Sequence, residues 1–228
     1  MKQLFLLTTL ILVFISCRTR TEPASANKIQ LILPDTANNG RAKDDLSNLE
    51  YRSKLESQMG FRDLRKGADS LEIRLWYSFS FSDFRELYTI RLCDSTCYLT
   101  YSKVYLRRIH YSVIANNPDW GSYNDPMVDS ISSKTVLLGK ADYEKVHLDS
   151  VWLLKAESEL RLPDTLSFSD CDSYALGVAD KRRFKYIRYH CPGGIYMKTH
   201  MKEVAAFMRY CERVMGLAGK RGWIPLEW

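Results

Sequence analysis

Apolar and polar residues alternate most regularly between residues 71 and 81, and this alternation predicts a β-strand. A period of two sends every second side chain to the same face, which a sheet buries against another layer. Two further β-rich runs, residues 84–92 and 98–109, flank a short loop and predict a hairpin. A shorter strand is expected at residues 132–138. The pattern in this part of the chain is therefore typical of a meander of antiparallel strands.

Apolar residues at helical spacing predict three helices around these strands. The apolar stripe is strongest in residues 200–217, and related patterns occur in residues 44–66 and 141–159. A last strand pair is expected at residues 167–178 and 184–191. An antiparallel sheet of hairpins packed by about three helices is an α+β fold, and this is the fold class that the sequence predicts.

The composition is that of a folded domain. The chain has 228 residues, of which 46% are hydrophobic and 26% are charged, and its formal net charge is +6. These proportions exclude an intrinsically disordered tail, a collagen-like repeat and a polytopic membrane protein. A single globular domain is the default expectation at this length.

The first 17 residues carry the features of an export signal. A basic start precedes a mostly apolar run at residues 4–15, which is too short to cross a bilayer as a helix. The tetrapeptide Phe-Ile-Ser-Cys that ends at Cys17 resembles the lipobox of bacterial lipoproteins, in particular the relaxed lipoboxes of Bacteroidetes. Phe14 takes the place of the leucine that this family usually has. The order of elements that follows is similar to that of small α+β lipoproteins.

The resemblance implies that the chain is cut before Cys17 and that the cysteine carries a diacylglycerol on its sulfur. Residues 1–16 are then a signal peptide, and residues 17–45 form the lipidated N-terminus and a flexible tether. The apolar patch at residues 29–33 is a candidate for a short strand that docks on the domain. Residues 46–228 are expected to form the single globular domain. Arg18 is not the acidic residue that retains some lipoproteins in the inner membrane, so the outer membrane is the expected location. The alternative is a plain signal peptide with an incidental cysteine.

Four further cysteines are expected to form two disulfides, because export brings the chain into an oxidising compartment. Cys93 and Cys97 bracket the predicted hairpin turn symmetrically, which favours a bond between them. Their spacing differs from that of a thioredoxin-like redox motif. Cys211 lies on the apolar stripe of the last helix and is expected to be a buried thiol.

The second predicted disulfide joins Cys171 and Cys191. Facing residues of antiparallel strands lie within the distance that a disulfide spans. The register that places the two cysteines opposite each other also aligns four apolar residues on one face, namely Leu176, Val178, Phe184 and Tyr186. We therefore expect these four side chains to be buried together beneath the last helix.

The same register places Asp172 opposite His190, and this pair is the candidate for acid–base chemistry. A carboxylate beside an imidazole can orient it as a general base, and the alternative is a cross-strand ion pair. The usual signatures of hydrolases, metalloproteases and nucleotide-binding enzymes are absent from the sequence. A glycan hydrolase using Asp170 and Asp172 would need two carboxylates across a cleft. No cofactor is expected, and the histidines do not have the spacing of a metal site.

Two further features suggest binding. Lys181, Arg182 and Arg183 cluster at a predicted turn among aromatic residues, which suits anionic lipid headgroups, an acidic partner protein or simply a solvated turn. Nucleic acid is not expected as a partner, because an exported protein seldom meets it. Trp76 on the polar side of its strand and Trp120 in a long loop are candidates for contact with a glycan or a protein.

Together these features predict a lipid-anchored protein of the cell envelope that acts by binding rather than by catalysis. Its expected partners are the membrane, through the anchor, and an envelope protein or glycan. Two alternatives stay open. One is a hydrolase of envelope glycan or peptide, and the other is an immunity or inhibitor protein that meets an incoming toxin.

Overall fold

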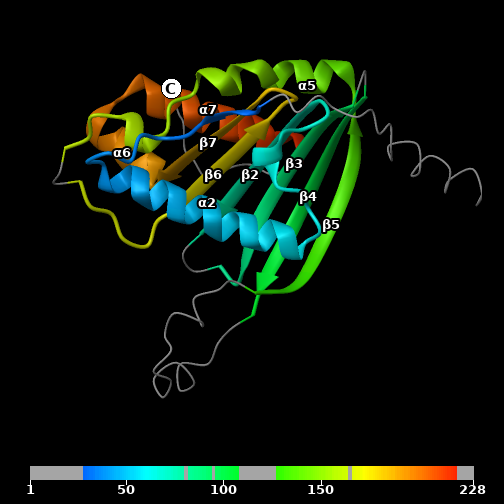
Figure 1. The fold of residues 1–228 in the computed structure, drawn as a ribbon, viewed down its shortest axis with the longest axis horizontal. Helices are drawn as coiled ribbons and strands as arrows, with labels where there is room; N and C mark the ends of the chain where they lie inside the picture. Colours follow the sequence, from blue (N-terminus) through cyan, green and yellow to red (C-terminus); the bar gives the residue numbers. More distant parts are fainter. Residues whose placement is uncertain (1–27, 80–81, 94–95, 108–126, 164–165, 220–228) are drawn as a thin grey trace, which may run out of the picture.

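The computed structural model describes residues 28–79, 82–93, 96–107, 127–163 and 166–219. Within these ranges the chain forms a seven-stranded sheet in the order β1-β7-β6-β2-β3-β4-β5 (Figure 1). Neighbouring strands are antiparallel except β1 and β7, which are parallel. The strand bounds are β1 (Gln30–Ile32), β2 (Leu71–Ser78), β3 (Phe84–Cys93), β4 (Thr96–Leu106), β5 (Val128–Leu138), β6 (Ser173–Ala179) and β7 (Arg183–His190).

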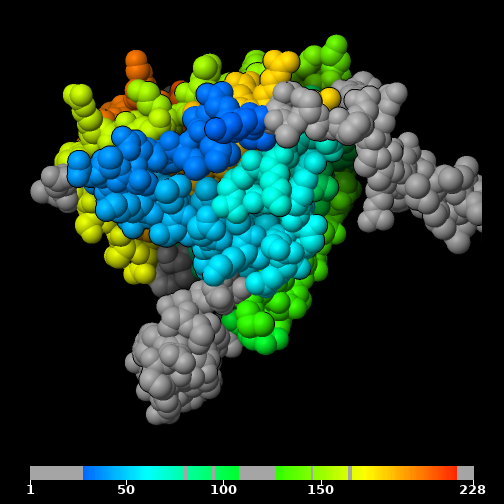
Figure 2. Space-filling model, in the orientation of Figure 1, coloured from blue at the N-terminus to red at the C-terminus, as the bar shows by residue number. Residues whose placement is uncertain are grey.

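Helices cover both faces of this sheet, so the predicted α+β class is confirmed. The helix α2 crosses one face, whereas α7, α6 and α5 contribute to the core on the other face (Figure 1). Figure 2 shows α2 lying across the middle of the first face. The bounds are α2 (Gly40–Gln58), α5 (Lys140–Val146), α6 (Pro192–Thr199) and α7 (Lys202–Leu217), with short 3₁₀ helices η1 (Leu64–Lys66), η2 (Leu148–Leu153) and η3 (Glu157–Glu159).

The strand β2 confirms the predicted alternation on one side. Ile73 and Leu75 are fully buried in a core cluster that includes Phe207 of α7. The opposite side of the strand, which the pattern marks as polar, is buried as well because α2 covers it. Trp76 on this side is only 2% exposed, so it is not the surface contact residue that the sequence suggests.

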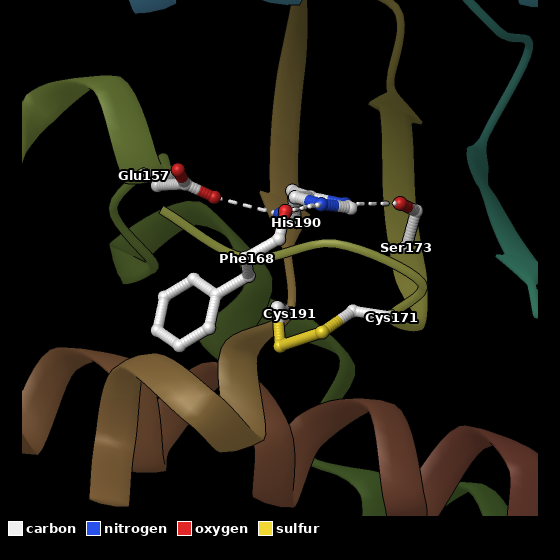
Figure 3. Close-up of a disulfide and its surroundings, with 6 residues drawn as sticks. All are labelled: Glu157, Phe168, Cys171, Ser173, His190 and Cys191. Carbon is white, nitrogen blue, oxygen red and sulfur yellow. Dashed lines mark hydrogen bonds between the residues drawn. A yellow bond between two sulfur atoms is a disulfide. The ribbon is translucent and has the colours of Figure 1, made fainter. Parts of the chain in front are cut away.

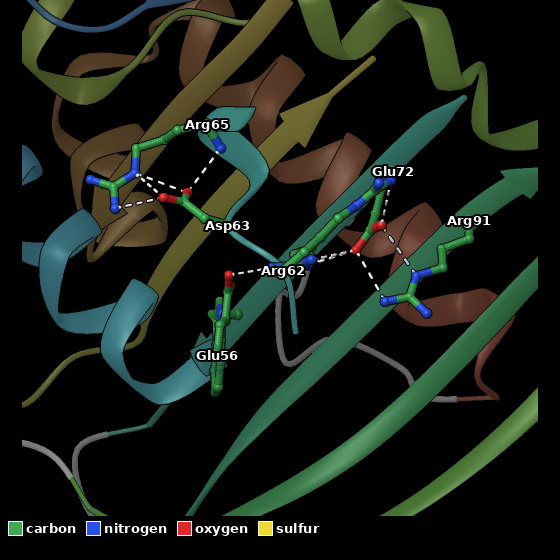
Figure 4. A network of polar contacts seen from close by, with 8 residues as sticks. Glu56, Arg62, Asp63, Arg65, Glu72 and Arg91 are labelled. Atoms are coloured by element: carbon green, nitrogen blue, oxygen red, sulfur yellow. Dashed lines mark hydrogen bonds and ion pairs between the residues drawn. The ribbon is translucent and has the colours of Figure 1, made fainter. Parts of the chain in front are cut away.

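Charged side chains of β2 are buried beneath α2 and neutralise one another. Arg74 is fully buried and forms ion pairs with Glu56 of α2 and with Glu72 of its own strand. The Glu72 carboxylate also lies 3.2 Å from Arg91 Nε and 3.9 Å from Arg62 Nη2 (Figure 4). Buried charges are tolerated where partners of opposite sign satisfy them. This network lets a strand with polar residues on one side lie between two layers.

The strands β6 and β7 pair in a register that is shifted by one residue from the predicted one. Tyr186 lies opposite Gly177 rather than Leu176. Leu176 and Val178 therefore belong to the core on the α7 side, whereas Phe184 and Tyr186 belong to the core on the α2 side. All four are buried, but the prediction that they share one face is wrong. A strand buried on both faces has no alternation that would fix its register.

The amino-terminal part of the domain begins earlier than predicted. β1 confirms that the apolar patch at residues 29–33 is a short strand docked on the domain, since it pairs with β7, and α2 begins at Gly40. The side chain of Asn39 caps α2 by accepting a hydrogen bond from the backbone N–H of Ala42 over 3.1 Å. Much of residues 28–45 therefore belongs to the folded domain rather than to the tether.

The helices on the other face differ from their predicted ranges in two places. The region of residues 141–159 is not one helix, because His147 takes a left-handed conformation that ends α5 and the chain continues as η2 and η3. α6 is an additional helix between β7 and α7. The prediction for residues 200–217 is confirmed by α7.

Candidate functional site

A pocket of about 390 Å³ lies where β2 and β3 meet the segment that leads into β6. Its volume is within the range of small-molecule sites. Two of its residues, Tyr77 of β2 and Glu86 of β3, lie directly opposite each other in the sheet. We call this pocket the acidic pocket. Among the described residues, its lining comprises three aromatic rings, a serine and two carboxylates: Tyr77, Phe79, Ser82, Phe84, Glu86 and Asp172.

Glu86 is held in place by two tyrosine hydroxyl groups. Tyr88 donates a hydrogen bond to one carboxylate oxygen, and Tyr101 donates to the other over 2.8 Å. The two tyrosines face each other across β3 and β4, with ring centroids 5.2 Å apart. Burial, together with the hydrogen bond to Glu86, raises the pKa of both hydroxyl groups. Both tyrosines therefore remain protonated donors, and the Glu86 carboxylate is fixed.

Asp172 is the second carboxylate of the acidic pocket. It accepts a hydrogen bond from the hydroxyl group of Tyr77. Burial raises the pKa of Asp172, while the hydrogen bond from Tyr77 opposes this rise. The Tyr77 ring packs against Tyr174 of β6 at a centroid distance of 5.0 Å. Tyr77 therefore faces Glu86 across the strands and fixes Asp172 through its hydroxyl group.

Phe79 and Phe84 give the acidic pocket apolar surface. The ring of Phe84 packs against Tyr105 with centroids 5.7 Å apart, and Lys103 Nζ lies 4.5 Å from the Phe84 centroid. Phe79 is 41% exposed. A concave site that combines rings with fixed carboxylates can stack on the apolar part of a ligand and accept hydrogen bonds from its polar part.

His190 does not face Asp172, so the predicted acid–base pair is wrong. Because of the shifted register Ser173 lies opposite His190, and Ser173 Oγ is 2.9 Å from His190 Nδ1 (Figure 3). His190 Nε2 lies 3.3 Å from the carbonyl oxygen of Phe168. Glu157 accepts a hydrogen bond from the backbone N–H of His190 rather than from its ring. The two ring nitrogens are therefore engaged by a hydroxyl group and a carbonyl, not by a carboxylate.

The predicted disulfide between Cys171 and Cys191 is present, with the two Cα atoms 5.1 Å apart (Figure 3). Both cysteines lie just beyond the last paired residues of β6 and β7. There the backbone N–H of Cys191 donates a hydrogen bond to the carbonyl oxygen of Asp172 over 2.8 Å. The bond joins residues at the open end of the hairpin, which is why it forms although the register differs from the predicted one.

The predicted disulfide between Cys93 and Cys97 is not formed. Cys93 pairs with Thr96, and Cys97 pairs with Leu92. Neighbouring positions of a strand point to opposite faces, so the two cysteine side chains lie on opposite sides of the hairpin. Cys211 is buried as predicted, and burial raises the pKa of its thiol.

The predicted basic cluster lies at the turn between β6 and β7, at the opposite end of β6 from the acidic pocket. Lys181 and Arg182 are exposed there. Arg183 has a structural role, because its Nε lies 2.9 Å from Asp180 Oδ2 and its guanidinium lies 3.9 Å from the Trp152 ring centroid. Asp180 also accepts hydrogen bonds from the backbone N–H groups of Arg182 and Arg183, which shapes the turn.

Two other predicted site residues, Cys17 and Trp120, lie outside the described residues. In the part of the chain that the structure describes, no helix is long and apolar enough to span a membrane. Within the same ranges, no group of three or more histidine, cysteine, aspartate or glutamate side chains is arranged to hold a metal ion. Comparison with known proteins finds no matching family, no matching curated protein and no matching solved structure.

Sequence reasoning missed Glu86 and the tyrosines around it. The signal was present in the hairpin strand, where Glu86 shares the parity of Phe84, Tyr88 and Ile90 and so interrupts an otherwise apolar face. A carboxylate on the buried side of a strand needs donors nearby. The pattern does not reveal that the donors are tyrosines of two strands, because this depends on the register between β3 and β4.

Proposed function

We propose that the protein is a lipid-anchored binding module of the cell envelope whose ligand occupies the acidic pocket. The observation that carries this proposal is the pocket itself, in which Tyr77, Tyr88 and Tyr101 hold two carboxylates in fixed positions beside exposed aromatic surface. The lipobox-like segment that ends at Cys17 supports the anchor. Fixed groups in a preformed concavity favour binding, because little order has to be created when the ligand enters.

Blocking the acidic pocket tests the binding function. Ser82 lines the pocket, so Ser82→Trp fills part of its volume, whereas Ser47→Trp adds the same ring to the exposed surface of α2. Saturation-transfer NMR on the full-length protein in deuterated detergent would be run with a panel of envelope oligosaccharides and peptides. We expect fragments that bind the wild type and Ser47→Trp to lose their signal with Ser82→Trp. Equal binding by all three proteins would refute the pocket as the ligand site.

The anchor is tested separately by Cys17→Ser. We expect the wild type to incorporate labelled fatty acid and to sediment with membranes, and the variant to lose the label and to appear in the soluble fraction. Cys93→Ser is the matched control, because it removes a cysteine without touching the lipobox-like segment. A variant that still partitions with membranes to the same extent would refute the lipid anchor.

A hydrolase is the second candidate, because the structure brings two carboxylates into one pocket. Glycoside hydrolysis uses one carboxyl group as a general acid and the other as a nucleophile or base. Asp172, whose pKa is raised by burial, fits the general acid, and Glu86 fits the partner role. Release of chromophore from aryl glycosides, lost in both Asp172→Asn and Glu86→Gln, would favour the enzyme. Ligand binding without turnover would favour the binding module.

A further inference from the structure

We infer that the acidic pocket recognises an organic cation, namely a protonated or quaternary ammonium group carried on a small aliphatic molecule or side chain. This inference rests on the proposed function, since it names the ligand class of the same pocket. It is carried by the juxtaposition of the Glu86 and Asp172 carboxylates with the rings of Tyr77, Phe79 and Phe84.

The hydrogen-bonding character of the acidic pocket is that of an acceptor. The hydroxyl protons of Tyr77, Tyr88 and Tyr101 are directed to the two carboxylates, so these donors are already used within the protein. What Glu86 and Asp172 still offer is the remaining acceptor capacity of four carboxylate oxygens. A ligand that carries positive charge and a hydroxyl or N–H donor complements this lining, whereas an anion would be repelled by it.

The two carboxylates are not neutralised within the described part of the chain. Arginine or lysine side chains of the described residues form no ion pair with Glu86 or Asp172, in contrast to Glu72, which is surrounded by three guanidinium groups. Lys103 faces Glu86 across β3 and β4, but its ammonium group lies over the Phe84 ring instead. The pocket therefore retains negative charge that a bound cation can balance.

The aromatic walls of the acidic pocket also attract a cation. Ammonium and quaternary ammonium groups bind to aromatic faces through the ring quadrupole, and several rings around one cation form a recognition cage. The ring of Phe84 already shows this interaction with Lys103 Nζ at 4.5 Å from its centroid. Tyr77 and Phe79 bring two further rings to the same pocket.

The decisive test compares choline with 3,3-dimethylbutan-1-ol, which has the same shape without the charge. Both would be titrated against the full-length protein by saturation-transfer NMR. We expect choline to bind at least about tenfold more tightly than the alcohol. Glu86→Gln should weaken choline binding by about tenfold and change the binding of the alcohol less than about twofold. Asp129→Asn, an exposed carboxylate on β5, is the matched control and should behave like the wild type.

A third variant tests whether the Phe84 ring contributes to cation binding. Lys103→Met removes the ammonium group that occupies the Phe84 ring and should strengthen choline binding by roughly threefold. Unchanged or weaker choline binding in Lys103→Met with the fold intact would contradict the cation role of this ring.

The outcomes distinguish the two proposals. Equal affinity for choline and the alcohol, both abolished by Ser82→Trp, overturns the cation inference and leaves the binding function standing. If neither compound binds in a manner that Ser82→Trp abolishes, the cation inference fails, and the fragment panel described above decides whether the proposed function fails with it.

Discussion

Asp45 is a carboxylate that the fold keeps out of water. It is 2% exposed, accepts a hydrogen bond from Ser158 over 2.6 Å and lies 3.5 Å from Arg188. Burial raises its pKa to about 6, since the hydrogen bond from Ser158 and the charge of Arg188 do not fully offset the loss of hydration, and the neighbouring Glu157 carboxylate adds to the rise. A carboxyl group whose pKa is raised in the folded state stabilises the fold below pH 4, and this contribution is lost as the pH rises through about 6.

We therefore expect Asp45→Asn to flatten part of the pH dependence of stability. Relative to the wild type, the free energy of unfolding of the variant should increase between pH 4 and pH 7, by at most about 3 kcal/mol. Urea unfolding at a series of pH values measures this difference. Glu157, whose pKa burial also raises, interacts with the charge of Asp45, so the measured difference includes the loss of this interaction. A constant difference across this range would show that Asp45 has an ordinary pKa.

The disulfide between Cys171 and Cys191 leads to a second prediction about individual residues. Replacing both cysteines with alanine opens a loop of about 20 residues, which loop-closure reasoning values at roughly 3 kcal/mol of stability. Urea unfolding measures this loss, and Cys93→Ser serves as the control with a small effect. Peptide mapping without reduction should recover the two cysteines in one linked fragment, with Cys93 and Cys97 unlinked. A linked Cys93–Cys97 peptide would contradict the β3–β4 register.

At the level of elements, Arg74 joins α2 to the sheet. It is buried between Glu56 of the helix and Glu72 of β2, and removing one partner from a buried ionic group leaves unpaired charge behind. Arg74→Met should therefore lower the free energy of unfolding by about 3–5 kcal/mol. Arg62→Met, which removes a half-exposed side chain 3.9 Å from Glu72, should cost less than about 1 kcal/mol. Equal effects in chemical denaturation would mean that the network does not couple helix and sheet.

The elements that sequence predicts well are those with one buried face. α7 has a clear apolar stripe, and its predicted range agrees with Lys202–Leu217. The hairpin β3–β4 was also predicted, because apolar residues and a short loop mark it. β6 and β7 were located, but their register was not, because α2 and α7 bury both of their faces and the sequence then shows no alternation.

The candidate site was predictable only in part. Asp172 was singled out because the predicted register placed it opposite His190. It does line the acidic pocket, but its partner there is Tyr77, and His190 contacts Ser173 instead. Glu86 was missed, because its importance depends on the pairing of β3 with β2 and β4. Contacts across strands depend on register, and a one-residue error exchanges every partner.

On the scale of the whole molecule, β5 is one of the two edge strands of the sheet within the described residues, the other being β1. β5 comes last in the strand order, and its pairing with β4 is regular from Ser130 to Leu138 before it shifts near Tyr105. Lys134 stands at the centre of this regular stretch. Two copies aligned antiparallel over it would place Lys134 opposite Lys134, which disfavours pairing.

Removing this charge should therefore expose the edge to self-association. Lys134→Ile leaves an edge with the apolar side chains of Ile131 and Leu137, which are already 42% and 66% exposed. We expect Lys134→Ile to form dimers or larger assemblies at concentrations where the wild type has a lower molar mass. Size-exclusion chromatography with light scattering measures this mass. Lys140→Ile, which also removes an exposed lysine, should leave the mass unchanged. A wild-type mass for Lys134→Ile would indicate that the edge is protected by other means.

The strand order has a consequence for how the chain reaches its folded state. β2 lies between β3, which follows it closely in the sequence, and β6, so that Ile73 pairs with Ile90 on one side and with Val178 on the other. Pairings between distant segments form slowly, because the intervening chain must first be closed into a loop. Until the β6–β7 hairpin has been synthesised and inserted between β1 and β2, β2 has an open edge. A chain that stops before residue 173 would present this edge to other chains, so completion of the carboxyl-terminal quarter protects the first half from aggregation.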